Sequence, residues 1–269
     1  MIINRIKLAA KVILGSRIAG REVKLFPDDV MVTSYPKSGN TWTRFLIANL
    51  ITDKDVTFKN IEEIIPDIYQ WGEKYLGSVT KPRVLKSHEY FDPRCKKIIY
   101  IVRDPRDVAV SYWYHQLKFG SISEGVMMDD FVDKFIAGKL DPFGSWGQNV
   151  GSWLGASEGD ENFLLIRYED LLKNSMSTME LISAFLNLNH SPERIAQAIE
   201  RSSLSNMKSM EKLQASDWKV LNKKHHKKDM PFVRQGKEGG WKNTLSDMSA
   251  ARMEQRWGTL MRRLGYLDK

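Results

Sequence analysis

The sequence predicts an α/β fold with a central, mainly parallel β-sheet flanked by helices. Short runs that read as strands occur at 30–32, 83–87, 97–102 and 163–167. Apolar residues at helical spacing follow the first, third and fourth of these runs. The third run, KIIYIV, is almost wholly apolar, which is typical of a strand covered on both faces of a parallel sheet.

The length and charge of the chain limit its organisation and its partners. The 269 residues are enough to bury a core as one large α/β domain or as two small ones. The formal net charge is +8 and the isoelectric point is about 9.4. This basic balance suits anionic partners such as nucleotides, acidic glycans, nucleic acid or a membrane surface.

The cysteine content and the N-terminal segment predict a cytoplasmic protein. Cys95 is the single cysteine of the sequence, which excludes an intramolecular disulfide and fits a reducing compartment. No apolar run approaches the roughly 18 residues of a membrane-spanning helix. Lys7, Lys11 and Arg17 interrupt the N-terminal apolar positions, which opposes a secretory signal. Residues 2–19 read instead as a basic amphipathic helix that either contacts a membrane or packs on the domain.

The stretch 30–42, VMVTSYPKSGNTW, predicts a phosphate site, because it reads as a buried strand, a sharp turn and the start of a helix. Backbone N–H groups at a helix N-terminus and the helix dipole favour an anion there. Lys37 adds a point charge, and Ser38 and Thr41 add hydroxyl donors. The stretch is not a Walker A loop, since its lysine precedes Gly39. An ordinary strand-to-helix turn remains the alternative for this stretch alone.

The string TSYPKSGNTW resembles the 5′-phosphosulfate loop of the cytosolic-type, PAPS-dependent sulfotransferases, where PAPS is 3′-phosphoadenosine 5′-phosphosulfate. The resemblance spans about residues 28 to 265. It implies a three-layer, P-loop-like fold and one sulfotransferase domain over 1–269, with a core at 28–265 after a basic amphipathic segment at 1–27. It also implies that the loop binds PAPS through Lys37, Ser38, Gly39, Asn40, Thr41 and Trp42.

A Lys-x-His string follows the run 83–87 and also resembles the family. Sites of parallel α/β sheets lie at the carboxyl ends of strands, where Lys86 and His88 are expected. An isolated histidine is more often a structural residue, so a functional role for His88 rests on its place in this string. The resemblance implies that His88 is the general base, a role worth roughly 10²–10⁴-fold in rate. Lys37 would stabilise the leaving 5′-phosphate, and Lys86 would hold the sulfuryl oxygens.

The string RDPRDVAVSY, which follows the run 97–102, resembles the family segment that binds the 3′-phosphate. Arg103 and Ser111 match the two residues of that pair. Arginine suits the role because its planar fork donates two parallel hydrogen bonds to phosphate oxygens. Without the resemblance, the same string reads as an aspartate that caps a helix starting near Val108, flanked by solvated arginines.

The string FVRQGKEGGWKN at 232–243 resembles the last motif of the family, with two departures. Gln235 stands where the family has lysine, and Gly240 stands where it has aspartate. Gln235 can still bond a phosphate, but it brings no charge. The resemblance implies nucleotide contacts from Phe232, Val233, Arg234, Gln235 and Gly236.

Two further positions carry weaker matches. Tyr168, which follows the run 163–167, matches the tyrosine that contacts the adenine. Ser202 begins the string SSLSNM, which resembles a family segment that runs under the purine.

The resemblance implies transfer of the sulfuryl group of PAPS to a hydroxyl or amine of a small-molecule, lipid or glycan acceptor, without a metal. The acceptor itself is not specified, because pocket walls come from loops with no fixed pattern. The short dimer motif of the family is mostly absent, since Asp247 and Ala251 replace its valine and glutamate. Dimerisation by that route is therefore not expected.

Two alternatives were weighed against this prediction. A nucleotide-dependent kinase with a modified P-loop would place a metal-binding aspartate at a strand end, but Arg103 is the first residue after KIIYIV. A basic nucleic-acid-binding protein would explain the isoelectric point. It would not explain three phosphate motifs in order, and we expect no nucleic-acid partner.

Overall fold

The computed structural model describes residues 19–214, 227 and 230–268. The expected amphipathic helix at 2–19 lies outside the described residues, apart from its last position. Within the described ranges, no helix is long and apolar enough to cross a membrane.

A four-stranded parallel sheet forms the centre of the described part of the chain. Its strands are β1 (Val30–Ser34), β2 (Val84–Ser87), β3 (Lys97–Val102) and β4 (Phe163–Arg167), in the spatial order β2-β1-β3-β4. Each of the three neighbouring pairs is parallel. The predicted fold class and the four predicted strands are therefore confirmed, and the apolar run KIIYIV is one of the two central strands.

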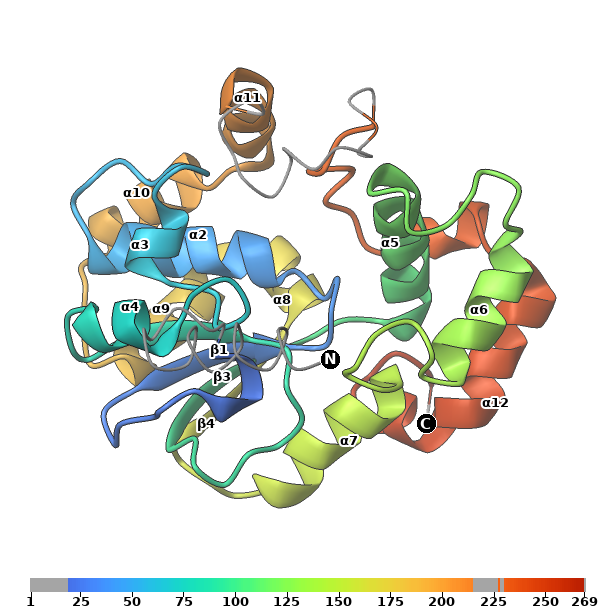
Figure 1. The fold of residues 1–269 in the computed structure, drawn as a ribbon, viewed down its shortest axis with the longest axis horizontal. Helices are drawn as coiled ribbons and strands as arrows, with labels where there is room; N and C mark the ends of the chain where they lie inside the picture. The colour runs from blue at the N-terminus through green and yellow to red at the C-terminus, as the bar shows by residue number, and fades with distance from the viewer. Residues whose placement is uncertain (1–18, 215–226, 228–229, 269) are drawn as a thin grey trace, which may run out of the picture.

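Helices follow the strands and make up most of the remaining described chain (Figure 1). The longer helices of the described residues are α2 (Asn40–Ile51), α5 (Pro105–Lys118), α6 (Met128–Ile136), α7 (Trp146–Ala156), α9 (Ser175–Phe185), α10 (Pro192–Arg201), α11 (Leu204–Gln214) and α12 (Asp247–Arg263). Shorter ones are η1 (Gly20–Glu22), α3 (Ile61–Ile64), α4 (Glu73–Ser78), α8 (Tyr168–Lys173) and η2 (Gly240–Asn243).

Helices pack on both faces of the sheet, which gives three layers (Figure 1). Because side chains alternate along a strand, β3 contributes to two cores. Its Ile99 and Ile101 pack with α2, α9 and α10 on one face. Its Ile98, Tyr100 and Val102 pack with α5, α6, α7 and α12 on the other.

The start of α5 differs from the prediction. The helix begins at Pro105 rather than near Val108, because Asp104 caps it and proline is well tolerated in a first helical turn. The carboxylate of Asp104 accepts the backbone N–H of Arg106 at 2.9 Å. Arg106 is not solvated either, since it is buried and its Nη2 lies 2.7 Å from Oδ2 of Asp104. The capping interpretation therefore holds for Asp104, while Arg106 is a structural residue.

Candidate active site

The strands end together at one edge of the sheet, because they are parallel and in close register. Thr33 of β1 pairs with Ser87 of β2, and Ser34 pairs with Ile101 of β3. Val102 of β3 pairs with Arg167 of β4. The residues that come next in the chain, four segments far apart in sequence, are therefore placed side by side at this edge.

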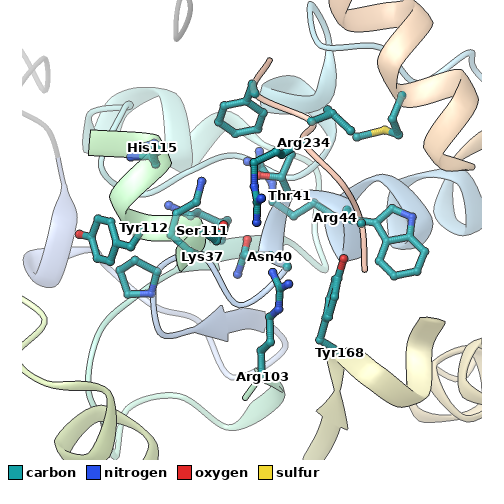
Figure 2. Close-up of a pocket in the computed structure, with 18 of the residues that line it drawn as sticks. Lys37, Asn40, Thr41, Arg44, Arg103, Ser111, Tyr112, His115, Tyr168 and Arg234 are labelled. Atoms are coloured by element: carbon teal, nitrogen blue, oxygen red, sulfur yellow. The ribbon is translucent and has the colours of Figure 1, made fainter. Parts of the chain in front are cut away.

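A cavity of about 410 Å³ lies at this edge, within the usual range for small-molecule sites. Figure 2 shows side chains from α2, α5, the end of β3, α8 and the 232–237 segment pointing into it. Of the residues singled out in the sequence, those that line it are Lys37, Gly39, Asn40, Thr41, Trp42, Lys86, His88, Arg103, Ser111, Tyr168, Phe232, Val233, Arg234, Gln235 and Gly236.

The loop between β1 and α2 turns sharply at the cavity. Lys37 and Gly39 have positive φ angles of 69° and 99°. A Cβ atom at Gly39 would lie 2.4 Å from a ring carbon of Tyr168, so this position requires glycine for space as well as for conformation. Asn40, the first residue of α2, donates to the carbonyl oxygen of Val32 at 3.2 Å, which ties the loop back to the strand. The helix N-terminus is thereby held at the cavity.

Several buried polar atoms at the cavity have no hydrogen-bond partner among the described residues. They are the hydroxyl of Ser38, Oδ1 of Asn40 and Nε of Arg103. Ser38 does not line the cavity, but it lies in the same loop and is fully buried. The hydroxyl of Ser38 and Nε of Arg103 are donors, and buried donors without a partner are costly, so these two fit an anionic ligand, whereas Oδ1 of Asn40 is an acceptor.

Lys37 carries the clearest electrostatic signature of the loop. Burial lowers the pKa of its ammonium to about 7, and the positive charges of Arg103, Lys86 and Arg234 add to that effect. Its Nζ lies 4.8 Å from the centre of the Phe232 ring. A site that crowds these cations together is built for a ligand with several negative charges.

His88, which also lines the cavity, is held in one tautomer. Its Nδ1 lies 2.7 Å from the carbonyl oxygen of Ser34. A carbonyl oxygen only accepts, so Nδ1 carries the hydrogen and Nε2 carries the lone pair. Burial first, and the charge of Lys86 second, lower the pKa of His88 to about 3, so the ring is neutral at physiological pH. The ring of Phe143 lies 5.5 Å away, centre to centre.

Arg103, Tyr168 and Arg234 form a cationic, aromatic corner. Arg103 lies over the ring of Tyr168, 4.3 Å from its centre, and its Nη2 donates to the carbonyl oxygen of Lys237 at 3.0 Å. Figure 2 shows the guanidinium groups of Arg103 and Arg234 pointing toward each other across the cavity. Two such groups facing one another favour a bound phosphate between them.

The segment 232–241, which we call the C-terminal loop, is fastened at both ends by carboxylates. Glu211 of α11 accepts the backbone N–H groups of Phe232 and Val233 at 2.6 and 2.7 Å. Asp107 of α5 accepts those of Gly239 and Trp241 at 2.7 and 2.9 Å. The loop thus spans from α11 to α5 over the cavity, which places Arg234 in it (Figure 1).

Comparison with known proteins identifies the family to which a chain with this site belongs. Residues 27–265 match the family described as the Sulfotransferase domain. The chain belongs to the PAPS-dependent sulfotransferase family. This sulfotransferase is 30% identical to Sulfotransferase 1E1 of Bos taurus over 240 residues, which cover 82% of this chain and 79% of the relative. It is 31% identical to Sulfotransferase 1E1 of Cavia porcellus, over 81% of this chain and 77% of that one.

Solved structures give the same result for the fold. The mouse sulfotransferase SULT7A1, crystallised in complex with PAP, superposes with a TM-score of 0.72 at 25% identity, covering 91% of this chain and 88% of that one. Retinol dehydratase, in complex with androsterone and the inactive cofactor PAP, superposes with a TM-score of 0.72 at 23% identity, over 90% and 83% of the two chains. The sulfotransferase described here therefore transfers the sulfuryl group of PAPS, and the predicted family and co-substrate are confirmed.

Ser202 lies away from the cavity of the sulfotransferase. It is fully buried at the end of α10, where its hydroxyl accepts from Nδ2 of Asn49 at 3.1 Å. Its carbonyl oxygen accepts from Nε1 of Trp42 at 2.9 Å. Trp42 in turn lies edge-on to Tyr168, with 5.7 Å between the ring centres. Ser202 is thus connected to the cavity wall through Trp42, and its predicted contact with the nucleotide stays a prediction.

Sequence reasoning missed several residues that line the cavity of the sulfotransferase. Arg44 lies one helical turn beyond Asn40, and His115 lies one turn beyond Ser111, so helical spacing from the motif residues would have found both. Leu172 likewise lies one turn beyond Tyr168, and Pro36, Tyr112 and Lys237 stand inside the quoted motif strings. No such signal existed for the others, which are Glu62, Asp67, Gln70, Phe143, Leu204 and Met207.

Proposed function

We propose that this enzyme transfers the sulfuryl group to a hydroxyl or amine of a small-molecule acceptor, with His88 as the general base. The observation that carries the proposal is the tautomer of His88. The hydrogen bond from Nδ1 to the carbonyl oxygen of Ser34 leaves the lone pair on Nε2, on a ring that is neutral and lines the cavity. A neutral imidazole with a fixed lone pair is suited to accept a proton from an attacking hydroxyl.

The reaction balances as a single displacement. The acceptor oxygen forms a bond to sulfur while its proton passes to Nε2 of His88. The bond from sulfur to the bridging oxygen of the 5′-phosphate breaks, and PAP leaves with the electron pair. Negative charge grows on that oxygen, where Lys37 and the N-terminus of α2 stabilise it.

The low pKa of His88 fits this role once the donor is bound. Without nucleotide, burial and the charges of Lys86 and Lys37 hold the pKa of the ring near 3. PAPS brings negative charge beside both lysines and offsets their effect on the ring. The basicity of Nε2 therefore rises when the donor is in place, and the base is strongest when it is needed.

On this proposal, the nucleotide is held by the cationic corner, by the loop between β1 and α2 and by the C-terminal loop. Arg103, Ser111 and Arg234 hold the 3′-phosphate, and Gln235 contacts it without adding charge. Tyr168 and Trp42 pack against the adenine, supported by their edge-on contact. Phe232, Val233 and Gly236 enclose the nucleotide from the C-terminal loop. Ser38, Gly39, Asn40 and Thr41 surround the 5′ end.

The acceptor lies, on this proposal, on the His88 side of the cavity. Phe143 and Tyr69 flank the histidine, with 5.2 Å between their ring centres. Retinol dehydratase, which has the same fold, was solved with androsterone. We therefore expect a small, partly apolar molecule rather than a polymer, with lipids and glycans as the competing acceptor classes.

The proposed function is tested with purified enzyme and labelled PAPS. Sulfuryl transfer to at least one member of a panel of phenols, alcohols, amines and glycans is expected, with full activity in excess EDTA. Within the described residues, no group of three or more His, Cys, Asp and Glu side chains could hold a metal ion. A strict magnesium requirement, or phosphoryl transfer from ATP in place of sulfuryl transfer, would favour the kinase alternative.

Nucleotide binding should also take up a proton through Lys37. At pH 8 the side chain of Lys37, with a pKa of about 7, is mostly the neutral amine. Bound phosphate raises this pKa, so up to about one proton is taken up per PAP bound. Calorimetric titration of PAP in buffers of different ionisation enthalpy measures this uptake. It should vanish in Lys37→Met and shrink at pH 6, where the lysine is already protonated. Equal heats in all buffers at pH 8 would contradict the assignment.

A further inference from the structure

The segment 66–70 contacts both Lys86 and His88 at the end of β2, although no sequence motif includes this segment. The backbone N–H of Lys86 donates to the carbonyl oxygen of Pro66 at 2.9 Å, and that of Ile68 donates to the carbonyl oxygen of Lys86 at 3.3 Å. Asp67 and Lys86 form an isolated parallel bridge. The segment is thereby fixed in register with β2, and its side chains are placed relative to the catalytic ones.

Asp67 forms an ion pair with Lys86 inside the wall of the cavity. Its Oδ2 lies 2.8 Å from Nζ of Lys86, and the side chains are each 10% exposed. Oδ1 accepts the backbone N–H of Tyr69 at 2.9 Å, which fixes the orientation of the carboxylate. Although burial opposes it, the charges of Lys86 and Arg44 keep the pKa of Asp67 below its usual value. The carboxylate is therefore ionised and directed at the ammonium.

The surroundings of Lys86 make this partner necessary. Burial lowers the pKa of its ammonium, and Arg44 of α2 lowers it as well. The charge of Lys86 in turn lowers the pKa of Lys37 and that of His88, so these groups also interact with it unfavourably when charged. The opposing charges are Asp67 and, more weakly, Glu62 of α3, which is itself paired with Arg44 at 2.9 Å. Asp67 is thus the main group that keeps a charge on Lys86 in a desolvated position.

The same segment also braces the histidine. The hydroxyl oxygen of Tyr69 accepts the backbone N–H of His88 at 3.1 Å. The two rings are nearly parallel, at 10° and 6.3 Å between centres. Lys86 Nζ lies 5.1 Å from the centre of the Tyr69 ring. Four consecutive residues, 66–69, therefore contact Lys86 or His88, the two groups that are proposed to act on the transferred group and on the acceptor.

We propose that Asp67 is a positioning residue of the transfer reaction, which holds the Lys86 ammonium charged and directed toward the sulfuryl group. The inference rests on the proposed transfer reaction and on the role that the family resemblance implies for Lys86, which is to hold the sulfuryl oxygens. It predicts that Asp67 acts on turnover only through Lys86. It also predicts that the loss of the carboxylate changes the pH range of activity, which a purely structural residue would not do.

The test is a double-mutant cycle with Asp67→Asn and Lys86→Met. Asp67→Asn keeps the acceptor for the Tyr69 N–H, removes the charge, and puts an amide NH2 donor where Oδ2 accepts from Lys86. It should lower kcat about tenfold at pH 7.5, move the alkaline limb of kcat to lower pH, and leave the PAP Kd within about twofold. The shift is downward because the buried ammonium loses its counter-charge. In the Lys86→Met background, Asp67→Asn should have no further effect.

The control variants distinguish a failure of the role proposed for Lys86 from a failure of the inference about Asp67. Asp92→Asn breaks an ion pair with Arg94 outside the cavity and should leave kcat and its pH profile unchanged. Normal turnover in Lys86→Met would overturn the role proposed for Lys86. Impaired Lys86→Met with normal Asp67→Asn would overturn the present inference alone. An equal loss from Asp67→Asn in both backgrounds would show that Asp67 supports the fold rather than Lys86.

A second variant keeps the inference testable if Asp67→Asn does not fold. Asp67→Glu retains the charge but moves it by one methylene group. It should lower kcat while the alkaline limb stays where it is in the wild type. A limb that moves to lower pH in Asp67→Glu would contradict the proposal, since the counter-charge is still present.

Discussion

Replacing His88 by asparagine should lower kcat by about 10²–10⁴-fold while the Kd for PAP changes little. The amide can still donate to the carbonyl oxygen of Ser34, but it has no basic lone pair for the acceptor proton. On the proposed function, the nucleotide contacts come from other segments of the cavity, so binding of PAP should survive. Steady-state turnover with PAPS and calorimetric titration with PAP give the two quantities.

A matched histidine provides the control. His190 makes a comparable bond, from Nε2 to the carbonyl oxygen of Leu50 at 2.9 Å, but it does not line the cavity. His190→Asn should leave kcat within about twofold. Two results would count against His88 as the base: near-normal kcat in His88→Asn, or an equal loss of PAP affinity and turnover.

Replacing Arg103 by alanine should weaken PAPS binding at least tenfold, about 1.4 kcal/mol. A hydrogen bond to a charged group contributes about 1.5–3 kcal/mol, and Arg103 combines charge, burial and an orphaned Nε in the cavity wall. Adenosine 5′-phosphosulfate, which lacks the 3′-phosphate, should lose far less. Titration of both nucleotides against both proteins measures the difference.

The comparison of the two nucleotides also removes the structural effects of the substitution. Arg103 stacks on Tyr168 and bonds the carbonyl oxygen of Lys237, so its loss disturbs the adenine side and the C-terminal loop. Those disturbances act on both ligands alike. Equal weakening would therefore assign Arg103 to the fold or the 5′ end. Gln235→Lys adds a cation to the same loop and should tighten PAPS with little effect on adenosine 5′-phosphosulfate.

The sequence was most informative where chemistry and local structure coincide. In the loop before α2, one short string specifies the strand, the positive φ at Gly39 and the charge of Lys37. The strands were found because each is short, apolar and followed by polar residues. His88 lies directly after β2 and lines the cavity, as expected from its sequence position, because the carboxyl ends of parallel strands share an edge.

Other features depend on contacts between distant segments and carry no local signal. Asp67 sits in an irregular segment, and only its pairing with β2 brings it to Lys86. Ser202 matches a family string, but the corner between α10 and α11 turns its hydroxyl toward Asn49. The helix α11 was not expected, and its Glu211 has a role that requires the C-terminal loop to pass beside it.

The two carboxylates under the C-terminal loop also determine which substitutions the loop can accept. They hold it through the main chain at positions 232, 233, 239 and 241. Apart from Gly239, whose φ of 67° favours glycine, the attachment is indifferent to the side chains there. It is not indifferent to proline, which has no N–H to donate. Changes of amino acid at 232, 233 and 241, proline excepted, are therefore compatible with an unchanged path of the loop. On the proposed function, residues 234–236 contact the nucleotide between the two attachments, together with Phe232 and Val233.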